Sequence, residues 1–249
     1  MLPSVKTGLC AGLGTAAAAA LAAGGWFYAS LAPGSRIFGR AITAPARPQE
    51  LALTFDDGPN PAWTPRLLDL LAQHDVRATF FLIGRHAQTD ADLARRIAAA
   101  GHVVGNHSWS HPNLARTSIV RVREELKRTQ ETLEQIIGAQ VLYFRPPYGA
   151  RRPAVFRIAR ELGLEPVLWN AMTTDWKEPS GERITARLVL KIDRMKRRGF
   201  AANIVLHDGN HRENCGDRGP SILAAALLLK KYQGTHRFVT LDNWAEGSS

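Results

Sequence analysis

The sequence is poor in cysteine and lacks the common nucleotide and nucleic-acid signatures. Its two cysteines, Cys10 and Cys215, lie far apart, so neither a disulfide framework nor a cysteine-based zinc site is expected. No Gly-x-Gly-x-x-Gly follows the first apolar run of the folded part, which removes the usual dinucleotide fingerprint. Zinc-finger spacing, basic-region heptads and an aromatic RNP-like run are also absent. We therefore expect no nucleic-acid partner.

Acidic residues are outnumbered by basic ones. The chain has 22 Asp and Glu against 32 Lys and Arg, for a net charge of +10. Such a surface suits an anionic partner such as lipid headgroups or an acidic cell-wall polymer, although an arginine-rich surface without a specific partner is the plain alternative. With 45% hydrophobic residues, the 249-residue chain can bury one sizeable core. We expect one α/β domain with an extension, and a monomer.

The amino end carries a long uncharged stretch. No charged residue occurs from Thr7 to Ser35, and about 20 apolar residues suffice to span a bilayer. Residues 1–33 are therefore expected to be a membrane anchor with a hydrophobic helix, or a signal segment cleaved after Ala32. Secretory apolar regions run only ~7–15 residues, which favours the anchor. Residues 34–48 are expected to be a linker, and residues 49–249 the folded domain.

The charges beside the apolar stretch raise a conflict. Arg36, Arg40 and Arg47 follow it, whereas Lys6 alone precedes it. The positive-inside rule would place the body of the protein in the cytoplasm. The substrate inferred below requires the opposite side. We therefore expect a cell-envelope protein with an extracytoplasmic catalytic domain, anchored or secreted.

From Glu50 onward, short apolar runs alternate with amphipathic stretches. Strands are expected at Leu51–Phe55, Ala78–Ile83, His102–Val104, Val141–Phe144, Pro166–Trp169, Ile204–Leu206 and Phe238–Leu241. Helices are expected at Thr64–His74, Asp90–Ala100, Ser118–Ile137, Pro153–Leu162, Glu182–Arg198 and Ser221–Tyr232. The alternation predicts a parallel sheet, and the number of repeats favours a closed or nearly closed barrel over a doubly wound open sheet.

The first expected strand ends at two adjacent carboxylates. Asp56 and Asp57 are followed by Gly58 and Pro59. Two anions at one strand end repel each other, and a bound cation would neutralise them and leave each free for a different role. A solvated turn is the plain alternative.

Two histidines four residues apart follow the third expected strand. On one helical turn His107 and His111 would face the same way, close enough to share a metal. Pro112 disfavours helix at His111, so a loop that only approximates such a turn is the alternative. With Asp57 they form a set of two histidines and one aspartate. Three ligands with open positions describe a catalytic site for a divalent transition ion, which we expect to be zinc, with cobalt and nickel as alternatives.

Three further motifs follow later strands: Arg145-Pro146-Pro147-Tyr148-Gly149, Asp175-Trp176 and Leu206-His207. Together with Thr-Phe-Asp-Asp-Gly-Pro and His-Ser-x-x-His, in this order, they resemble the polysaccharide deacetylases of the NodB-homology type, carbohydrate esterase family 4. The resemblance covers roughly Glu50 to Leu241. It implies a distorted (β/α) barrel and a metal-dependent hydrolase that removes acetyl groups from the N-acetylated sugars of a polysaccharide.

The resemblance also assigns roles to residues. Asp57, His107 and His111 would hold the metal, which would activate a water and polarise the acetamide carbonyl. Asp56 would be the general base, kept ionised by Arg145.

The backbone N–H of Tyr148 would help to stabilise the oxyanion. His207 would be the general acid that protonates the leaving amine, with a pKa raised by Asp175. Trp176 and Leu206 would line the pocket for the acetyl methyl group, and Tyr148 would also contact the substrate. The polymer stays open among peptidoglycan, chitin oligomers, exopolysaccharide and acetylated xylan, with an envelope glycan preferred.

Two other classes remain as alternatives. A metal-independent glycoside hydrolase could use Asp56, Asp57 and Asp175, but it would leave the two histidines without a role. A non-catalytic glycan-binding module has no need for Asp56, Arg145 and His207 together. The histidines outside the motifs are expected at the surface or behind the site: His74, His86, His102, His211 and His236.

Overall fold

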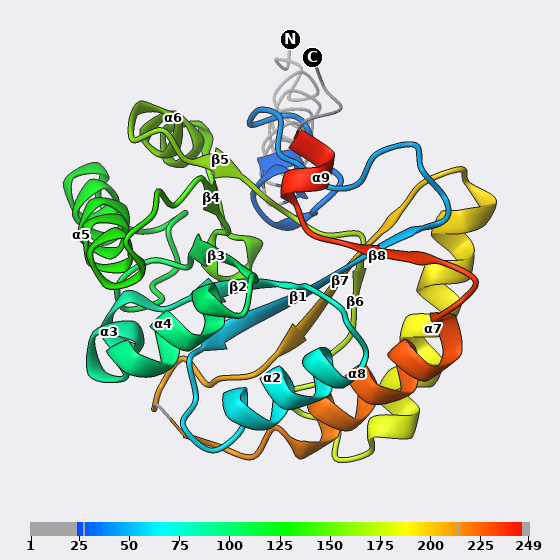
Figure 1. Cartoon of the computed structure of the whole chain (residues 1–249). Helices are drawn as coiled ribbons and strands as arrows, with labels where there is room; N and C mark the ends of the chain where they lie inside the picture. The colour runs from blue at the N-terminus through cyan, green and yellow to red at the C-terminus, as the bar shows by residue number, and fades with distance from the viewer. Residues whose placement is uncertain (1–23, 27, 214, 246–249) are drawn as a thin grey trace, which may run out of the picture.

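A curled parallel sheet forms the centre of the molecule, and helices surround it (Figure 1). The computed structural model describes residues 24–26, 28–213 and 215–245. Its strands are β1 (Glu50–Gly58), β2 (Thr79–Leu82), β3 (Val103–Asn106), β4 (Tyr143–Phe144), β5 (Glu165–Pro166), β6 (Ala171–Met172), β7 (Ala202–His207) and β8 (Arg237–Val239). Its helices are α2 (Thr64–Gln73), α3 (Gly84–Thr89), α4 (Ala91–Ala99), α5 (Ile119–Ile137), α6 (Pro153–Glu161), α7 (Gly181–Arg197), α8 (Gly219–Tyr232) and α9 (Asp242–Ala245).

The sheet has the order β5-β4-β3-β2-β1-β7-β6, with β8 added beside β1. All pairings between the described strands are parallel, which confirms the predicted α/β fold. Its form is a curled half-barrel. The two edges come from one segment, because β5 pairs with β4 and β6, only a few residues later, pairs with β7.

Strand β1 is central and buried along its whole length. Its side chains alternate between two faces, as in any strand. Leu51, Leu53 and Phe55 join the main core, which the helices cover. Thr54 and Asp56 point to the opposite face, into the hollow of the sheet. The register sets Asp56 opposite His207 of β7, so two candidate catalytic residues lie side by side.

All six expected helices form, with bounds close to those predicted. Helix α5 begins after Ser118, whose side chain accepts a hydrogen bond from the Arg121 N–H. It ends at Gly138, which has a φ of 69°. Helices α3 and α9 were not expected, since each is too short to show the helical period in the sequence.

The segment before β1 packs against the domain. Ile42 forms a parallel bridge with Val167. The fully buried Arg151 donates hydrogen bonds to the carbonyls of Ser30, Ala32 and Ser35. The expected hydrophobic helix falls mainly on residues 1–23, which lie outside the described residues. No helix in the described ranges is long and apolar enough to span a bilayer.

Candidate active site

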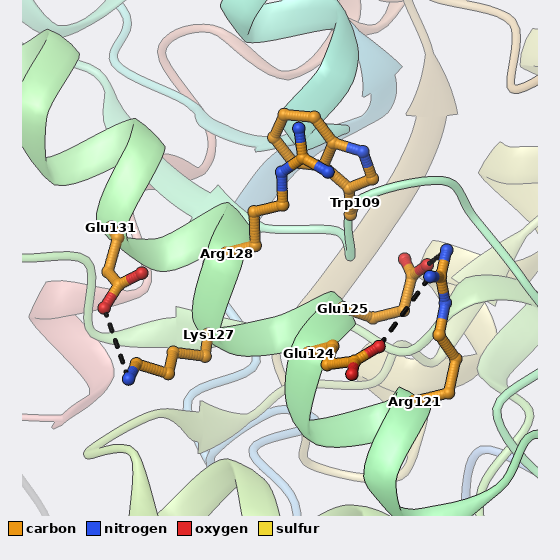
Figure 2. Close-up of a pocket in the computed structure, with 7 residues that line it drawn as sticks. All are labelled: Trp109, Arg121, Glu124, Glu125, Lys127, Arg128 and Glu131. Atoms are coloured by element: carbon orange, nitrogen blue, oxygen red, sulfur yellow. Dashed lines mark ion pairs between the residues drawn. The ribbon is translucent and has the colours of Figure 1, made fainter.

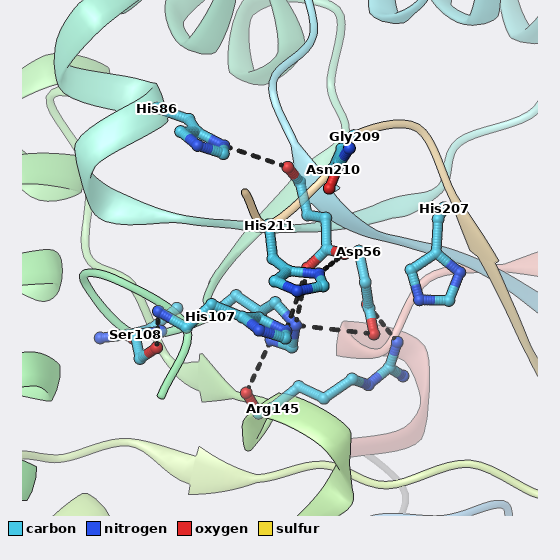
Figure 3. Close-up of polar contacts among 12 residues, drawn as sticks. Asp56, His86, His107, Ser108, Arg145, His207, Gly209, Asn210 and His211 are labelled. Atoms are coloured by element: carbon cyan, nitrogen blue, oxygen red, sulfur yellow. Dashed lines mark hydrogen bonds and ion pairs between the residues drawn. The ribbon is translucent and has the colours of Figure 1, made fainter. Parts of the chain in front are cut away.

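Asp57, His107 and His111 form a buried cluster at the carboxyl ends of β1 and β3. Figure 3 shows His107 with its contacts to Asp56 and to the Arg145 carbonyl. Asp57 Oδ1 lies 3.2 Å from His111 Nε2 and 3.5 Å from His107 Nε2. One ligand atom from each residue lies within 4.8 Å of the other two. Over the described part of the chain, this is the one group of three or more such residues that could hold a metal ion.

The hydrogen bonds around the cluster leave its ligand atoms free for a cation. His107 Nδ1 lies 2.8 Å from the backbone carbonyl of Arg145, which can only accept, so Nδ1 carries the proton. The other ring nitrogen, Nε2, faces Asp57. Asp57 Oδ1 is buried and has no hydrogen-bond donor among the described residues. A buried carboxylate oxygen facing two imidazole nitrogens fits a divalent transition ion.

The charge states also suit a metal. Burial alone would raise the pKa of Asp57, but the surrounding imidazoles, His107 first and then His111 and His207, hold that pKa well below its usual range. Burial lowers the pKa of His111 to about 3, although Asp57 opposes this. At neutral pH Asp57 is ionised and His111 is neutral, the forms that coordinate metals.

Left-handed backbone conformations gather at the site. Among the described non-glycine residues, positive φ angles occur at Asp57 (72°), Ser108 (63°), His111 (60°) and Tyr148 (59°), and outside the site at Asp75 (51°). Such angles are uncommon for residues with a Cβ and cost free energy, so the surrounding contacts must hold them in place.

Residues 107–111 form a loop and not a helical turn. Ser108 Oγ accepts the His111 N–H at 3.1 Å, and this brings the second histidine back towards the first. The buried carboxylate of Glu125, on α5, accepts the Ser110 N–H at 2.8 Å and its hydroxyl at 2.7 Å. The loop alternative foreseen from Pro112 is therefore the one that the chain adopts.

Helix α5 also holds the tip of this loop through Trp109 (Figure 2). The Arg128 guanidinium lies 3.6 Å from the Trp109 ring centroid. A pocket of about 320 Å³ lies here, lined by Trp109 and charged residues of α5. Two ion pairs within the helix, Arg121–Glu124 and Lys127–Glu131, join charged side chains that line this pocket. The contact between Trp109 and Arg128 thus holds residues 107–111 against α5.

Asp56 forms an ion pair with a fully buried arginine. Arg145 Nη1 lies 2.7 Å from Asp56 Oδ1 and 2.7 Å from Thr54 Oγ1. Its Nη2 donates to Asn203 Oδ1 at 3.3 Å, so the guanidinium contacts three side chains and does not form a bidentate pair with one carboxylate. Asp56 Oδ2 lies 4.0 Å from His107 Nε2, at the edge of the metal cluster. A buried guanidinium needs an anionic partner, and Asp56 supplies it at 2.7 Å.

His207 faces the cluster from β7 and is held by Asp175. Its Nδ1 donates to Asp175 Oδ1 at 2.9 Å, and its backbone N–H donates to Asp175 Oδ2 at 2.8 Å. Ser221 donates to Oδ2 as well, at 2.7 Å. Burial would lower the pKa of His207, but the charge and hydrogen bond of Asp175, with Asp57 and Asp56 behind, raise it to about 9. At neutral pH His207 is protonated, and Nε2 is left to donate.

These groups open into one pocket of about 280 Å³. It is lined by Asp56, Asp57, His107, His111, Pro146, Tyr148, Trp169, Met172, Trp176, His207 and His211. The metal cluster is buried, whereas Tyr148 is 51% exposed and Trp176 39% exposed. The two aromatic rings therefore belong to the mouth of the pocket.

One expected lining residue faces elsewhere. Leu206 is fully buried in the main core, on the helix-covered side of β7. Because strand side chains alternate, the residue on the same face as His207 is Val205. Val205 packs with Trp169 and beside Met172, both of which line the pocket. Leu206 itself is not among the residues that line the pocket.

Two functional neighbours were not singled out from the sequence. His211 lies in the loop after β7, with Nδ1 3.9 Å from Asp57 Oδ2. Its ring stacks on that of His111, with centroids 4.7 Å apart and planes at 22°. His86 lies behind the site, with Nδ1 3.4 Å from the Asp57 carbonyl. The only signal for His211 was its place a few residues after His207.

Asp208 is a third neighbour of the site that lies outside the motifs. It is fully buried, accepts a hydrogen bond from Thr64, and burial raises its pKa to about 7. A Cβ on Gly58 would lie 2.5 Å from Asp208 Oδ2, and one on Gly209 would lie 1.9 Å from the Asp57 carbonyl oxygen. Glycine is therefore required at both positions for the ends of β1 and β7 to approach so closely.

Comparison with known proteins gives consistent matches. The family model described as polysaccharide deacetylase matches residues 43–167. A peptidoglycan-N-acetylglucosamine deacetylase of Bacillus cereus is 36% identical over 211 residues, which cover 84% of this chain and 72% of that protein. A chitooligosaccharide deacetylase of Azorhizobium caulinodans is 36% identical over 174 residues, 70% of this chain and 80% of that protein.

A solved structure shows the same fold. It is the Bc1960 peptidoglycan N-acetylglucosamine deacetylase in complex with 4-naphthalen-1-yl-N-oxidanyl-benzamide. The match has a TM-score of 0.71 and 35% sequence identity, and covers 82% of this chain and 91% of that one.

Proposed function

Since this chain belongs to the polysaccharide deacetylase family, we propose that it removes acetyl groups from the N-acetylated sugars of an envelope glycan. It is a carbohydrate deacetylase, a hydrolase of carbon–nitrogen bonds other than peptide bonds. The observation that carries the proposal is one pocket in which the Asp57–His107–His111 cluster lies beside the Asp56–Arg145 and His207–Asp175 pairs.

The residues fit a metal. Asp57, His107 and His111 would hold one divalent ion, and two imidazoles with one carboxylate favour Zn²⁺, with Co²⁺ or Ni²⁺ as alternatives. When bound, the ion would supply Lewis acidity at the acetyl carbonyl.

Asp56 and Tyr148 act on the attacking side. Asp56, paired with Arg145, accepts the proton of the water as its oxygen bonds to the acetyl carbon. The backbone N–H of Tyr148, at the pocket mouth, donates to the carbonyl oxygen as negative charge develops there. The left-handed φ of 59° at Tyr148 turns the peptide that carries this donor.

His207 acts on the leaving side. Its Nε2–H protonates the sugar nitrogen as the bond from nitrogen to the acetyl carbon breaks, and acetate and a free amine result. Asp175 orients the ring through Nδ1 and keeps it protonated until this step. Trp176, with its ring centroid 4.9 Å from that of His207, closes this side of the pocket.

A glycoside hydrolase is disfavoured by the same geometry. Such an enzyme needs two carboxylates that flank the scissile bond and are free to react. Asp175 is buried, and its oxygens are taken by His207 and Ser221. Asp57 faces the imidazoles, which leaves Asp56 as the one carboxylate at the edge of the cluster.

Peptidoglycan is the substrate that we put first, with chitin-like oligomers second. Relatives named for both are similar over most of this chain. The pocket mouth is bordered by the exposed rings of Tyr148 and Trp176, as a site that receives one sugar of a longer chain requires.

The function is tested by acetate release from purified protein. We expect acetate from peptidoglycan or N-acetylglucosamine oligomers, loss of that acetate with a chelator, and its return with added Zn²⁺. Acetylated xylan is the comparison substrate. Cleavage of glycosidic bonds in the presence of the chelator would contradict the proposal and indicate a metal-independent glycoside hydrolase.

The uncharged amino end is a candidate membrane anchor. We propose that residues 1–33 form a hydrophobic helix that anchors an extracytoplasmic domain, because no charge occurs from Thr7 to Ser35. The full chain is then expected in the membrane fraction of the cells that make it. Sequencing of the mature amino end decides between the two forms, since a chain that begins at Pro33 would mean a cleaved signal and a secreted enzyme.

A further inference from the structure

We propose that His211 is a substrate-contacting residue, whose imidazole and the ring of Tyr148 form an aromatic wall against the sugar that carries the acetamide. The inference rests on the proposed function and adds a residue outside the five motifs. It is carried by three observations: the position of the ring, its exposure, and the contacts that fix its loop.

The ring of His211 lies against those of His111 and Tyr148. Its centroid is 4.7 Å from that of His111 and 5.8 Å from that of Tyr148, which in turn contacts His111 at 4.6 Å. The three rings form one continuous aromatic surface along this side of the pocket. Trp176, beside His207, stands on the side of the proposed acid.

The ring is placed for a ligand and not for the metal. The group of atoms close enough to share an ion comprises Asp57, His107 and His111, and His211 is not among them. Its nearest approach to a ligand residue is the 3.9 Å between Nδ1 and Asp57 Oδ2. The ring of His211 instead stacks on that of His111, with planes at 22°.

The chemistry of the substrate places its sugar at this height. Only one nitrogen separates the acetyl carbon from the sugar ring. With the acetyl group at the buried cluster, the ring must lie in the mouth of the pocket. The partly exposed aromatic side chains stand there: Tyr148, Trp176 and His211, whose side chain is 35% exposed. Aromatic rings offer a large, rigid apolar face that suits the C–H face of a sugar.

The loop that carries His211 is fixed before any substrate binds. Arg85, on α3, donates through Nη2 to the carbonyls of His211 and Arg212. Arg218 Nε donates to the Gly209 carbonyl at 2.6 Å, and Asn210 Oδ1 accepts the Arg212 N–H at 3.1 Å. A contact residue held in this way loses little conformational entropy on binding.

The experiment compares His211→Ala and His211→Phe with the wild type in the zinc-loaded protein. We expect the alanine variant to raise KM for an N-acetylglucosamine oligomer about 2- to 10-fold, as for loss of one aromatic contact, with the effect in KM and not in kcat. The phenylalanine variant keeps the ring face and most of the affinity. Metal content stays equal in all three. His74→Ala, a histidine bonded to Gln233 away from the pocket, is the matched control.

A binding measurement separates this inference from the proposed function. In an Asp56→Asn background, the Kd for the same oligomer should rise with His211→Ala by the same factor, and by less with Arg85→Ala, which frees the loop. An unchanged Kd overturns the inference even if the wild type releases acetate. A drop in bound zinc in His211→Ala overturns it too, since the ring would then be a metal ligand. Absence of acetate from every acetylated glycan instead refutes the proposed function.

Discussion

Replacement of Asp57 by alanine is expected to remove the metal and, with it, acetate release. Asp57 is the one anionic ligand of the cluster, and it lies within 3.5 Å of both histidine nitrogens. Without it two neutral imidazoles would have to hold a divalent ion alone, and the charge that offsets the cation is gone. Metal analysis of the purified variant and its acetate release on one oligomer are the two measurements. His107→Ala should behave alike.

The chain supplies a matched control for this variant. Asp75 is also an aspartate with a left-handed backbone, at a φ of 51°, but it lies in the turn after α2. Asp75→Ala makes the same side-chain change in a left-handed backbone and should leave metal content and activity at the wild-type level. Wild-type metal content in Asp57→Ala would remove that residue from the ligand set.

Asp56→Asn and His207→Ala are expected to slow acetate release by about 10²–10⁴-fold each, the usual worth of a positioned acid or base. Both variants should keep the metal, because neither residue belongs to the ligand group. Asn at position 56 preserves the shape beside Arg145 but cannot accept the proton. Full activity of His207→Ala would leave the leaving-group step without the proposed acid.

The pH dependence of kcat/KM tests the role of His207 and its pairing with Asp175. His207 works protonated, and its pKa of about 9 predicts that the rate is present below that pH and lost as the pH rises through it. Asp175 favours the protonated ring, so Asp175→Asn should move the alkaline limb of kcat/KM to lower pH and leave the acidic limb in place. An alkaline limb that stays where it was would mean that another group causes it.

The sequence could indicate that the motifs lie together because each stands at the end of a strand. In a parallel sheet these ends meet at one edge, so Asp57, His107 and Arg145 could be brought together without knowledge of distances. The register between neighbouring strands could not be predicted from the sequence. The pairing of Asp56 with His207 depends on how β1 aligns with β7, and nothing within either strand states it.

Other differences have identifiable physical causes. Leu206 was assigned to the pocket although strand alternation from His207 already pointed to Val205. One strand is expected at Pro166–Trp169, whereas the chain forms β5 before it and β6 after it, because the bend between the two strand partners leaves no local signal in the sequence. His211 and Asp208 reach the site through tertiary contacts alone. Arg151 is buried by its contacts with the carbonyls of Ser30 and Ser35, which lie more than a hundred residues earlier in the chain and leave no local signal.

The left-handed residues around the pocket bear on how such an enzyme can change over time. A residue with a Cβ loses about 1–2 kcal/mol in this conformation, whereas glycine adopts it freely, at an entropy cost of about 0.5–1 kcal/mol. Selection for stability alone would therefore tolerate or favour glycine at Ser108 and Tyr148. Such replacements would delete the hydroxyl that holds His111 and the ring at the pocket mouth. The fold would be retained while catalytic activity was lost. At these few residues, therefore, selection for stability and selection for activity act in opposite directions.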